Sequence, residues 1–231
     1  METEKKDSDG KEIMEDICVG KVQMEESDEE KYLGDIITKD GRNLKNIQSR
    51  INKGKGKVKR ISEILNGVPF GKLYFQVAII LRNSLLVSSV LCNSETWFNL
   101  TKSELDLLET VDLLLLRTIL GAPKTVAKEM LYLELGVIPL REMVRQRRLN
   151  FLHYILKQDK ESILFKVFEA QKKNRNRKDW VTSVIQDLEE LELDVNFETI
   201  QKMGKEAWRN TIRNTIYLKS FRKLEQLKET H

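Results

Sequence analysis

The sequence is poor in cysteine, proline, histidine and aromatic residues, and each shortage excludes a class of protein. Its 231 residues include 2 Cys, 3 Pro and 2 His, and only 7% are aromatic. Two cysteines, Cys18 and Cys92, cannot build a disulfide framework or a four-ligand zinc site. The fold must therefore depend on packing, and an intracellular, reducing compartment is expected.

The residues needed for a catalytic or metal site are also scarce. His153 and the terminal His231 lie far apart in the sequence, so neither a Ser-His-Asp nor a Cys-His arrangement has support. No pair of Cys or His has the spacing that chelates zinc. We therefore expect no catalytic residue, no metal and no cofactor.

No apolar run is long enough to predict a membrane span. The most apolar stretch, residues 77–92, is interrupted by Arg82, Asn83 and three serines, whereas a span needs about 18 continuous apolar residues. The first residues are polar and acidic, unlike a secretory signal. The sequence predicts a buried helix at 77–92 and no membrane partner.

What the chain has in abundance is charge, and the two signs are separated. Charged residues make up 33% of the sequence, and the formal net charge is +4. Residues 1–30 carry 12 Asp/Glu against 4 Lys/Arg, so the rest of the chain carries 36 Lys/Arg against 24 Asp/Glu. A basic body without membrane features favours nucleic-acid phosphates as partners. A plain solvated surface is the alternative.

Hydrophobic periodicity predicts a mainly α-helical protein, with one or more helical bundles and a small N-terminal β-hairpin. Strand-like segments at 13–24 and 31–38, joined by 25–30, are expected to form that hairpin. It must pack on another part of the chain or on a partner, because an isolated hairpin is marginal in water. The expected divisions are a disordered acidic lead at 1–12, the hairpin at 13–41, a helical domain at 42–157 and basic C-terminal helices at 158–231.

Local signals mark individual helix positions. Thr101 and Glu104 have the spacing of a capping box, and Gly121 is expected to end that helix. Gly54 and Gly56 fall inside a helical pattern, where each costs about 1 kcal/mol relative to Ala. Their presence indicates a kink or a close approach of another backbone. A last helix is expected from about residue 198 to 228.

The first long helix is predicted to carry a basic ridge. Apolar residues recur from Leu44 to Leu65 at steps of three and four, which places them on one stripe. Four basic residues fall roughly opposite that stripe at about 100 degrees per residue, and we expect them to contact phosphates, with a solvated face as the alternative. These residues are Arg50, Lys53, Lys57 and Arg60.

A second basic ridge is predicted on the helix that follows Pro139. Arg141, Arg145 and Arg148 lie at positions i, i+4 and i+7, so they share one side of the helix. Phosphate contact and an ordinary solvated face are equally open for these three. Trp97, Trp180 and Trp208 are expected to be core or interface anchors rather than base-stacking platforms.

Several short motifs, taken in order, resemble the carboxy-terminal part of reverse transcriptases of non-LTR (LINE-type) retrotransposons. They are KYLGDIITKDG at 31–41, SETW at 94–97, LLE at 107–109 and LRTILG at 116–121. The order of these pieces carries the resemblance, since each is short. Together they cover about residues 13–160, and more loosely the helices that follow.

The resemblance implies a fold and a function for each part. In the family, the KYLG segment closes the palm near the primer terminus, so Tyr32, Leu33 and Gly34 would belong to that hairpin. The helices after it form the thumb, which grips the template-primer duplex. The paired aspartates of the family's Y-x-D-D turn, which hold two metal ions, have no counterpart here. The chain thus resembles a truncated, non-catalytic remnant of an RNA-directed DNA polymerase.

Three hypotheses stay open. The first is a thumb-like helical protein that binds RNA or DNA duplexes without sequence preference. The second is a helical protein-interaction or scaffold module, which binds a protein partner or itself through exposed apolar helices such as 103–120. The third is a translated element fragment with no selected function. A nuclear and a cytoplasmic location are equally compatible with the sequence.

Overall fold

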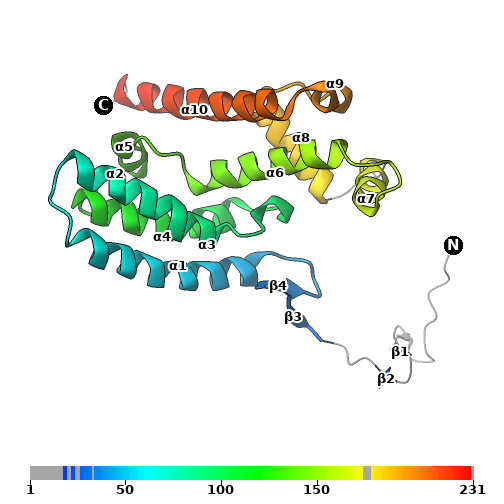
Figure 1. The fold of residues 1–231 in the computed structure, drawn as a ribbon, viewed down its shortest axis with the longest axis horizontal. Helices are drawn as coiled ribbons and strands as arrows, with labels where there is room; N and C mark the ends of the chain where they lie inside the picture. The colour runs from blue at the N-terminus through cyan, green and yellow to red at the C-terminus, as the bar shows by residue number, and fades with distance from the viewer. Residues whose placement is uncertain (1–17, 20–21, 24–26, 33, 174–177, 230–231) are drawn as a thin grey trace.

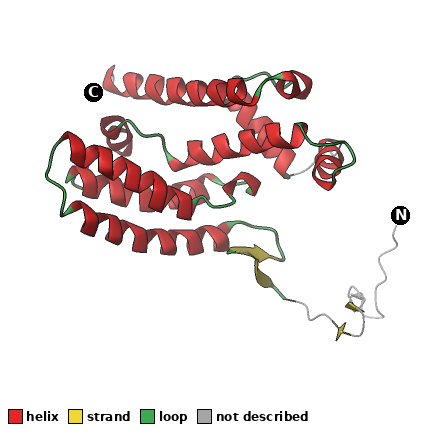
Figure 2. Cartoon of the chain, in the orientation of Figure 1, coloured by secondary structure: helices red, strands yellow, loops and turns green. Residues whose placement is uncertain are grey.

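The protein is mainly α-helical, as the periodicity predicts. About 70% of it is helix (Figure 2). The computed structural model describes residues 18–19, 22–23, 27–32, 34–173 and 178–229. The predicted lead at 1–12 lies outside these ranges. The principal helices are α1 (Leu44–Leu65), α2 (Lys72–Leu81), α3 (Ser88–Val90), α4 (Lys102–Leu120), α5 (Lys128–Leu135), α6 (Leu140–Leu156), α7 (Ile163–Lys172), α8 (Trp180–Glu190), α9 (Phe197–Lys202) and α10 (Lys205–Glu229).

The helices are stacked in layers (Figure 1). Helix α1 forms one outer layer, and α2 and α4 pack on it. Helix α6 contacts α4 on one side and α10 on the other, so it lies in the middle of the stack. Helices α7 and α8 pack near the C-terminal half of α6. One long face of α1 is therefore left uncovered by other helices.

Two short hairpins replace the single predicted one. Strands β1 (Cys18–Val19) and β2 (Val22–Gln23) pair antiparallel, and so do β3 (Glu29–Tyr32) and β4 (Asp35–Thr38). The predicted strand at 31–38 is interrupted because Gly34 has a φ of 91°, a conformation that lets the chain reverse. The second hairpin packs on α1 through β4, which meets the expectation that it needs support.

Two hydrophobic clusters share α6. Leu140 and Val144, near its start, belong to the cluster built by α1 to α5. Leu149 and Leu152 belong to the cluster that α6 builds with α7 to α10. The second cluster therefore begins inside α6. Because one rigid helix contributes to both, the two halves of the bundle are joined by a continuous element.

The apolar segment after residue 71 is buried on one face only. Helix α2 continues through a π-helical turn (Arg82–Val87) into α3. Arg82 is fully buried and donates two hydrogen bonds to the equally buried Asp112 of α4, at 2.7 and 2.6 Å. Outward-facing Leu73 and Ile80 are exposed. The prediction of a buried helix is therefore correct for the inner face alone.

Helix ends follow the local signals except near the C-terminus. Thr101 and Glu104 form both hydrogen bonds of the predicted capping box, and Gly121 ends α4 with a φ of 60°. The single last helix predicted for 198–228 is wrong, because the chain is extended at Met203 between α9 and α10. That break lets the Met203 carbonyl accept a hydrogen bond from the ring of His153, at 3.0 Å.

Candidate nucleic-acid interface

Helix α1 presents its apolar stripe to the core. Ile47, Ile51, Val58, Ile61 and Leu65 are buried, whereas Leu44 at the first position is partly exposed. Burying such a stripe is what stabilises an amphipathic helix of this length. It also fixes which side of the helix faces solvent.

Gly54 explains how closely α1 packs. A methyl group added at this position would lie 2.8 Å from Val90 Cγ2 and 3.0 Å from Val111 Cγ2, closer than side-chain atoms normally approach. The close approach at Gly54 is therefore made by side chains of α3 and α4 and not by another backbone. Gly56, in contrast, has open space around it, so its absence of a side chain serves no packing contact.

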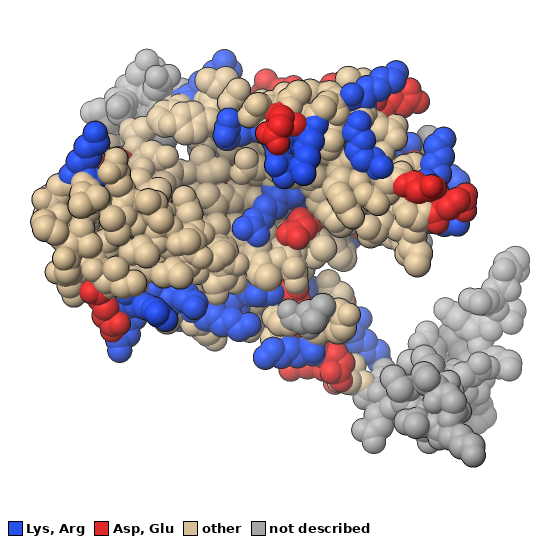
Figure 3. Space-filling model, viewed as in Figure 1, with Lys and Arg blue, Asp and Glu red and all other residues tan. Residues whose placement is uncertain are grey.

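The uncovered face of α1 is strongly cationic. Lys/Arg side chains follow the lower edge of the molecule, along α1 (Figure 3). Within α1, Lys59 has an acidic neighbour, Glu63, at 4.0 Å, and Glu63 is the helix's single acidic residue. The outer cations are exposed, except that Lys57 is half-buried. This surface, which we call the α1 outer face, comprises Lys53, Lys55, Lys57, Lys59 and Arg60.

Most of these cations lack an acidic partner. Among the described residues, no carboxylate lies within ion-pair distance of Lys53, Lys55, Lys57 or Arg60. Their charges therefore face water with little compensation. Unpaired cations on one side of a rigid helix are what a phosphate backbone requires of a protein, because each contact releases a condensed counterion.

Arg50 does not belong to this face, and its predicted place on the ridge is wrong. The residue is 4% exposed and donates from Nη2 to Asp35 Oδ1 at 2.5 Å. Arg50 lies at the edge of the ridge nearest the apolar stripe, where the incoming hairpin covers it. It therefore holds the hairpin on α1 and has no exposed charge to offer a phosphate.

Asp35 is the residue that the sequence analysis missed at this junction. It accepts hydrogen bonds from Arg50, from Asn46 at 2.9 Å and from Asn93 at 2.5 Å. Burial raises its pKa, but these hydrogen bonds and the attraction to Arg50 outweigh burial and bring the pKa below its usual value. An acid in the middle of the strand predicted at 31–38 is the signal that could have indicated a buried partner.

The hairpin residues singled out by the resemblance lie next to Asp35. Tyr32 ends β3 and is 65% exposed, and Gly34 makes the turn. Leu33 lies outside the described residues. The ring of Tyr32 thus faces solvent rather than the bundle.

Arg141, at the start of the second predicted ridge, is paired with acids of α4. It donates to both oxygens of Glu109, at 2.5 and 2.7 Å, and to Asp106 at 2.6 Å. The hydrogen bonds to Glu109, more than its partial burial, set the pKa of Arg141 above its usual value. Its charge therefore joins α4 to α6 instead of facing solvent.

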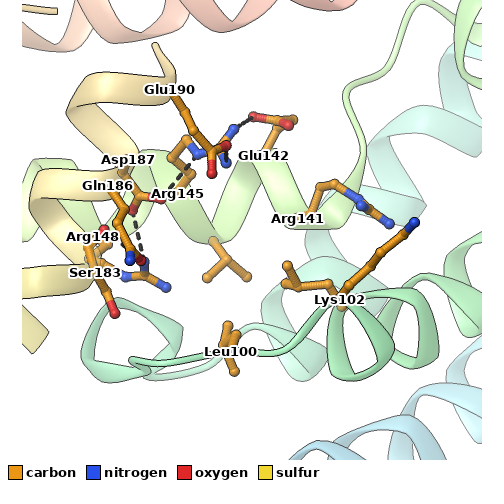
Figure 4. Close-up of a pocket in the computed structure, with 12 residues that line it drawn as sticks. Leu100, Lys102, Arg141, Glu142, Arg145, Arg148, Ser183, Gln186, Asp187 and Glu190 are labelled. Carbon is orange, nitrogen blue, oxygen red and sulfur yellow. Dashed lines mark hydrogen bonds and ion pairs between the residues drawn. The ribbon is translucent and has the colours of Figure 1, made fainter. Parts of the chain in front are cut away.

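Arg145 and Arg148 are paired with acids of α8 (Figure 4). Arg145 bonds Asp187 at 3.0 Å and Glu142 at 2.7 Å, and it also bonds Glu190. Arg148 is buried and bonds Asp187 at 2.9 Å. The predicted basic ridge is wrong for Arg148, which is buried, whereas Arg141 and Arg145 are partly exposed and have their charges paired with carboxylates.

The tryptophans are anchors, as expected. All three are buried. The indole N–H of Trp180 donates to the Glu95 carbonyl at 2.7 Å, and that of Trp208 donates to the Leu149 carbonyl at 3.0 Å. None of these rings is available to stack on a base.

Within the described ranges, no three His, Cys, Asp or Glu residues are grouped so that they could hold a metal ion. One helical segment, Lys72–Val90, is long and apolar enough to cross a membrane by length and composition alone. Core helices meet the same criterion, and the inner face of this segment packs in the bundle. The segment alone therefore does not indicate a membrane span.

The fold and its surface define a layered helical protein whose α1 outer face is cationic. Comparison of the chain with protein-family models, with curated proteins and with solved structures found no match.

Proposed function

We propose that the protein binds nucleic-acid duplexes without sequence preference through the α1 outer face, in the manner of a polymerase thumb, and that it does not catalyse nucleotide transfer. The observation that carries this proposal is the α1 outer face, which places five cations on a helix that contains one acid. Contacts of Lys and Arg with phosphates supply most of the affinity in non-specific binding.

The surface also favours a duplex over a single strand. Proteins that bind single strands stack bases on exposed aromatic side chains, and α1 contains no aromatic residue. The cations lie in two rows along the helix, Lys53, Lys57 and Arg60 in one and Lys55 and Lys59 in the other, and cations held at fixed positions on a helix suit the regular phosphate backbone of a duplex. The proposal rests on this charge pattern together with the motif order at 31–121.

A gel-shift assay at low salt tests this function. The full chain is expected to shift two duplexes of unrelated sequence with equal affinity. Reversing the charge at Lys53, Lys57 and Arg60 should strongly weaken the shift, because three of the five phosphate contacts are replaced by repulsion. A variant that still shifts both duplexes equally well contradicts the proposal for this helix.

A primer-extension assay tests the non-catalytic part separately. With a primed template, deoxynucleotides and Mg²⁺, the purified chain should leave the primer unextended. Extension would show that a catalytic site exists and would overturn this part of the proposal.

The second candidate function is binding of a protein partner, and the exposed apolar side of α2 favours it. Phe70, just before α2, is 78% exposed, and Leu73 and Ile80, which lie seven residues apart and so on one side of α2, are exposed as well. Exposed apolar groups that cluster are typical of interaction surfaces. Light scattering after size-exclusion chromatography separates the two candidate functions. Self-association that is insensitive to salt and is lost in Leu73→Asp supports the second candidate function.

A further inference from the structure

A cavity of about 400 Å³ lies between α6, α8 and the beginning of α4. Its volume is in the range of small-molecule sites, which is about 300–1,000 Å³. No residue of α1 lines it, so it is separate from the α1 outer face. Figure 4 shows α6 and α8 side chains projecting into it from above and Leu100 forming part of its floor.

Arg148 supplies this cavity with unused hydrogen-bond donors. Its side chain is 7% exposed, and Nη1 donates to Asp187 and, at 3.4 Å, to the Ser183 carbonyl. Nε is buried without a partner, and no described residue accepts a hydrogen bond from Nη2. Because Nε is fully buried, Nη2 is the Arg148 donor that an oxygen acceptor entering the cavity can reach, and such an acceptor would satisfy a donor that the protein leaves unpaired.

The other free groups of the cavity are donors as well. Lys102 and Gln186 line it, and neither has a hydrogen-bond partner among the described residues. The three carboxylates of the lining already accept hydrogen bonds from Arg145 or Arg148. A molecule rich in acceptor oxygens can use the N–H groups of Lys102, Gln186 and Arg148 Nη2 that have no described acceptor, although Glu142 and Glu190 each keep one oxygen without a described donor.

The charged residues that line the cavity and its apolar floor restrict the class of ligand further. Arg141 is paired with Asp106 and Glu109, so the other three cations and the three carboxylates of the lining balance. Lys102 is the lining cation that forms no ion pair with a described residue, so it can attract a monoanion. Leu100, Leu105 and Val144 supply an apolar floor. We propose that this cavity binds a small organic monocarboxylate, whose carboxylate accepts from Arg148 and Gln186 while its apolar body lies on the leucines.

Ligand-observed NMR with benzoate tests the site. Benzyl alcohol and benzylamine have a similar shape without the carboxylate, so they serve as neutral and cationic controls. Benzoate should give saturable binding in the millimolar range or tighter, and each control should bind at least about tenfold more weakly, the loss expected for one charge-assisted hydrogen bond. Equal binding of all three probes, or no saturable benzoate signal, overturns the proposal.

Variants at exposed positions locate the binding without unfolding the chain. Gln186→Leu should weaken benzoate about tenfold, and Gln186→Trp should block the cavity and abolish binding. Lys55→Met removes one charge from the α1 outer face and should leave benzoate affinity unchanged. Unaltered affinity in Gln186→Trp would place the ligand elsewhere and would overturn the assignment. Duplex affinity should be the same in Gln186→Trp and in the parent chain.

Discussion

The salt dependence of duplex binding follows directly from the number of cations on the α1 outer face. Five cations lie there, and each phosphate contact with B-form DNA contributes about −0.9 to the slope of log affinity against log salt concentration. The expected slope is therefore about −4.5. Raising the salt from about 50 to about 200 mM should weaken binding by about 500-fold.

Charge reversal at Lys53, Lys57 and Arg60 should change the slope itself. At most two contacts remain, so the slope should fall to about −1.8 and the same salt increase should weaken binding only about tenfold. Fluorescence anisotropy with a labelled duplex at five or more salt concentrations measures both slopes. The matched control changes the net charge equally by reversing three exposed lysines of the other half of the bundle. These are Lys157, Lys160 and Lys173.

The two triple variants separate a local interface from a general effect of net charge. The control variant should keep a slope near −4.5, since its residues lie outside the interface. Equal slopes in the parent chain and in the α1 variant would refute the reasoning. Equal losses in both variants would show that long-range charge, rather than contact, determines affinity.

The remaining predictions concern stability. Gly54→Ala should lower the unfolding midpoint in urea because the new methyl group would overlap Val90. Gly56→Ala should raise the free energy of unfolding by about 1 kcal/mol. Higher stability in both variants would show that α1 packs loosely. Arg82→Met should cost about 3–5 kcal/mol, since it leaves a buried carboxylate unpaired, and adding Asp112→Leu should restore most of the melting temperature. The native pKa of Asp35 is below its usual value, so its contribution to stability is present above about pH 4 and is lost as the pH falls through the native pKa. Hydrogen exchange in β4 should therefore depend less on pH between 6 and 3 in Asp35→Asn than in the parent chain. The same pH dependence in both would contradict the role of Asp35.

Features decided by neighbouring residues could be predicted from the sequence. The stripe of α1 and the capping box at Thr101 depend on spacings of three and four residues. The close approach at Gly54 could also be anticipated, because a glycine inside an amphipathic pattern is costly unless packing requires it. These local rules were enough to establish the helical class and three residues of the α1 outer face, Lys53, Lys57 and Arg60, whereas they missed Lys55 and Lys59.

Features decided by distant partners could not be predicted. The acids that pair with Arg141 and with Arg148 lie more than thirty residues away in the sequence, in α4 and α8. Periodicity shows which side of a helix a residue occupies, but it does not show which element covers that side. Arg50 is the clearest case, because the hairpin that buries it precedes α1 in the sequence and reaches it through Asp35.

Protection of lysines from acetylation, measured residue by residue with mass spectrometry, tests the central claim most directly. The full chain is treated with a limiting acetylating reagent with and without a duplex at low salt. Lys53, Lys55 and Lys59 should be strongly protected by the duplex, while Lys157 and Lys160 should react equally in both samples. Protection confined to the C-terminal lysines, or equal reactivity of all lysines under conditions in which the duplex is bound, would contradict the account.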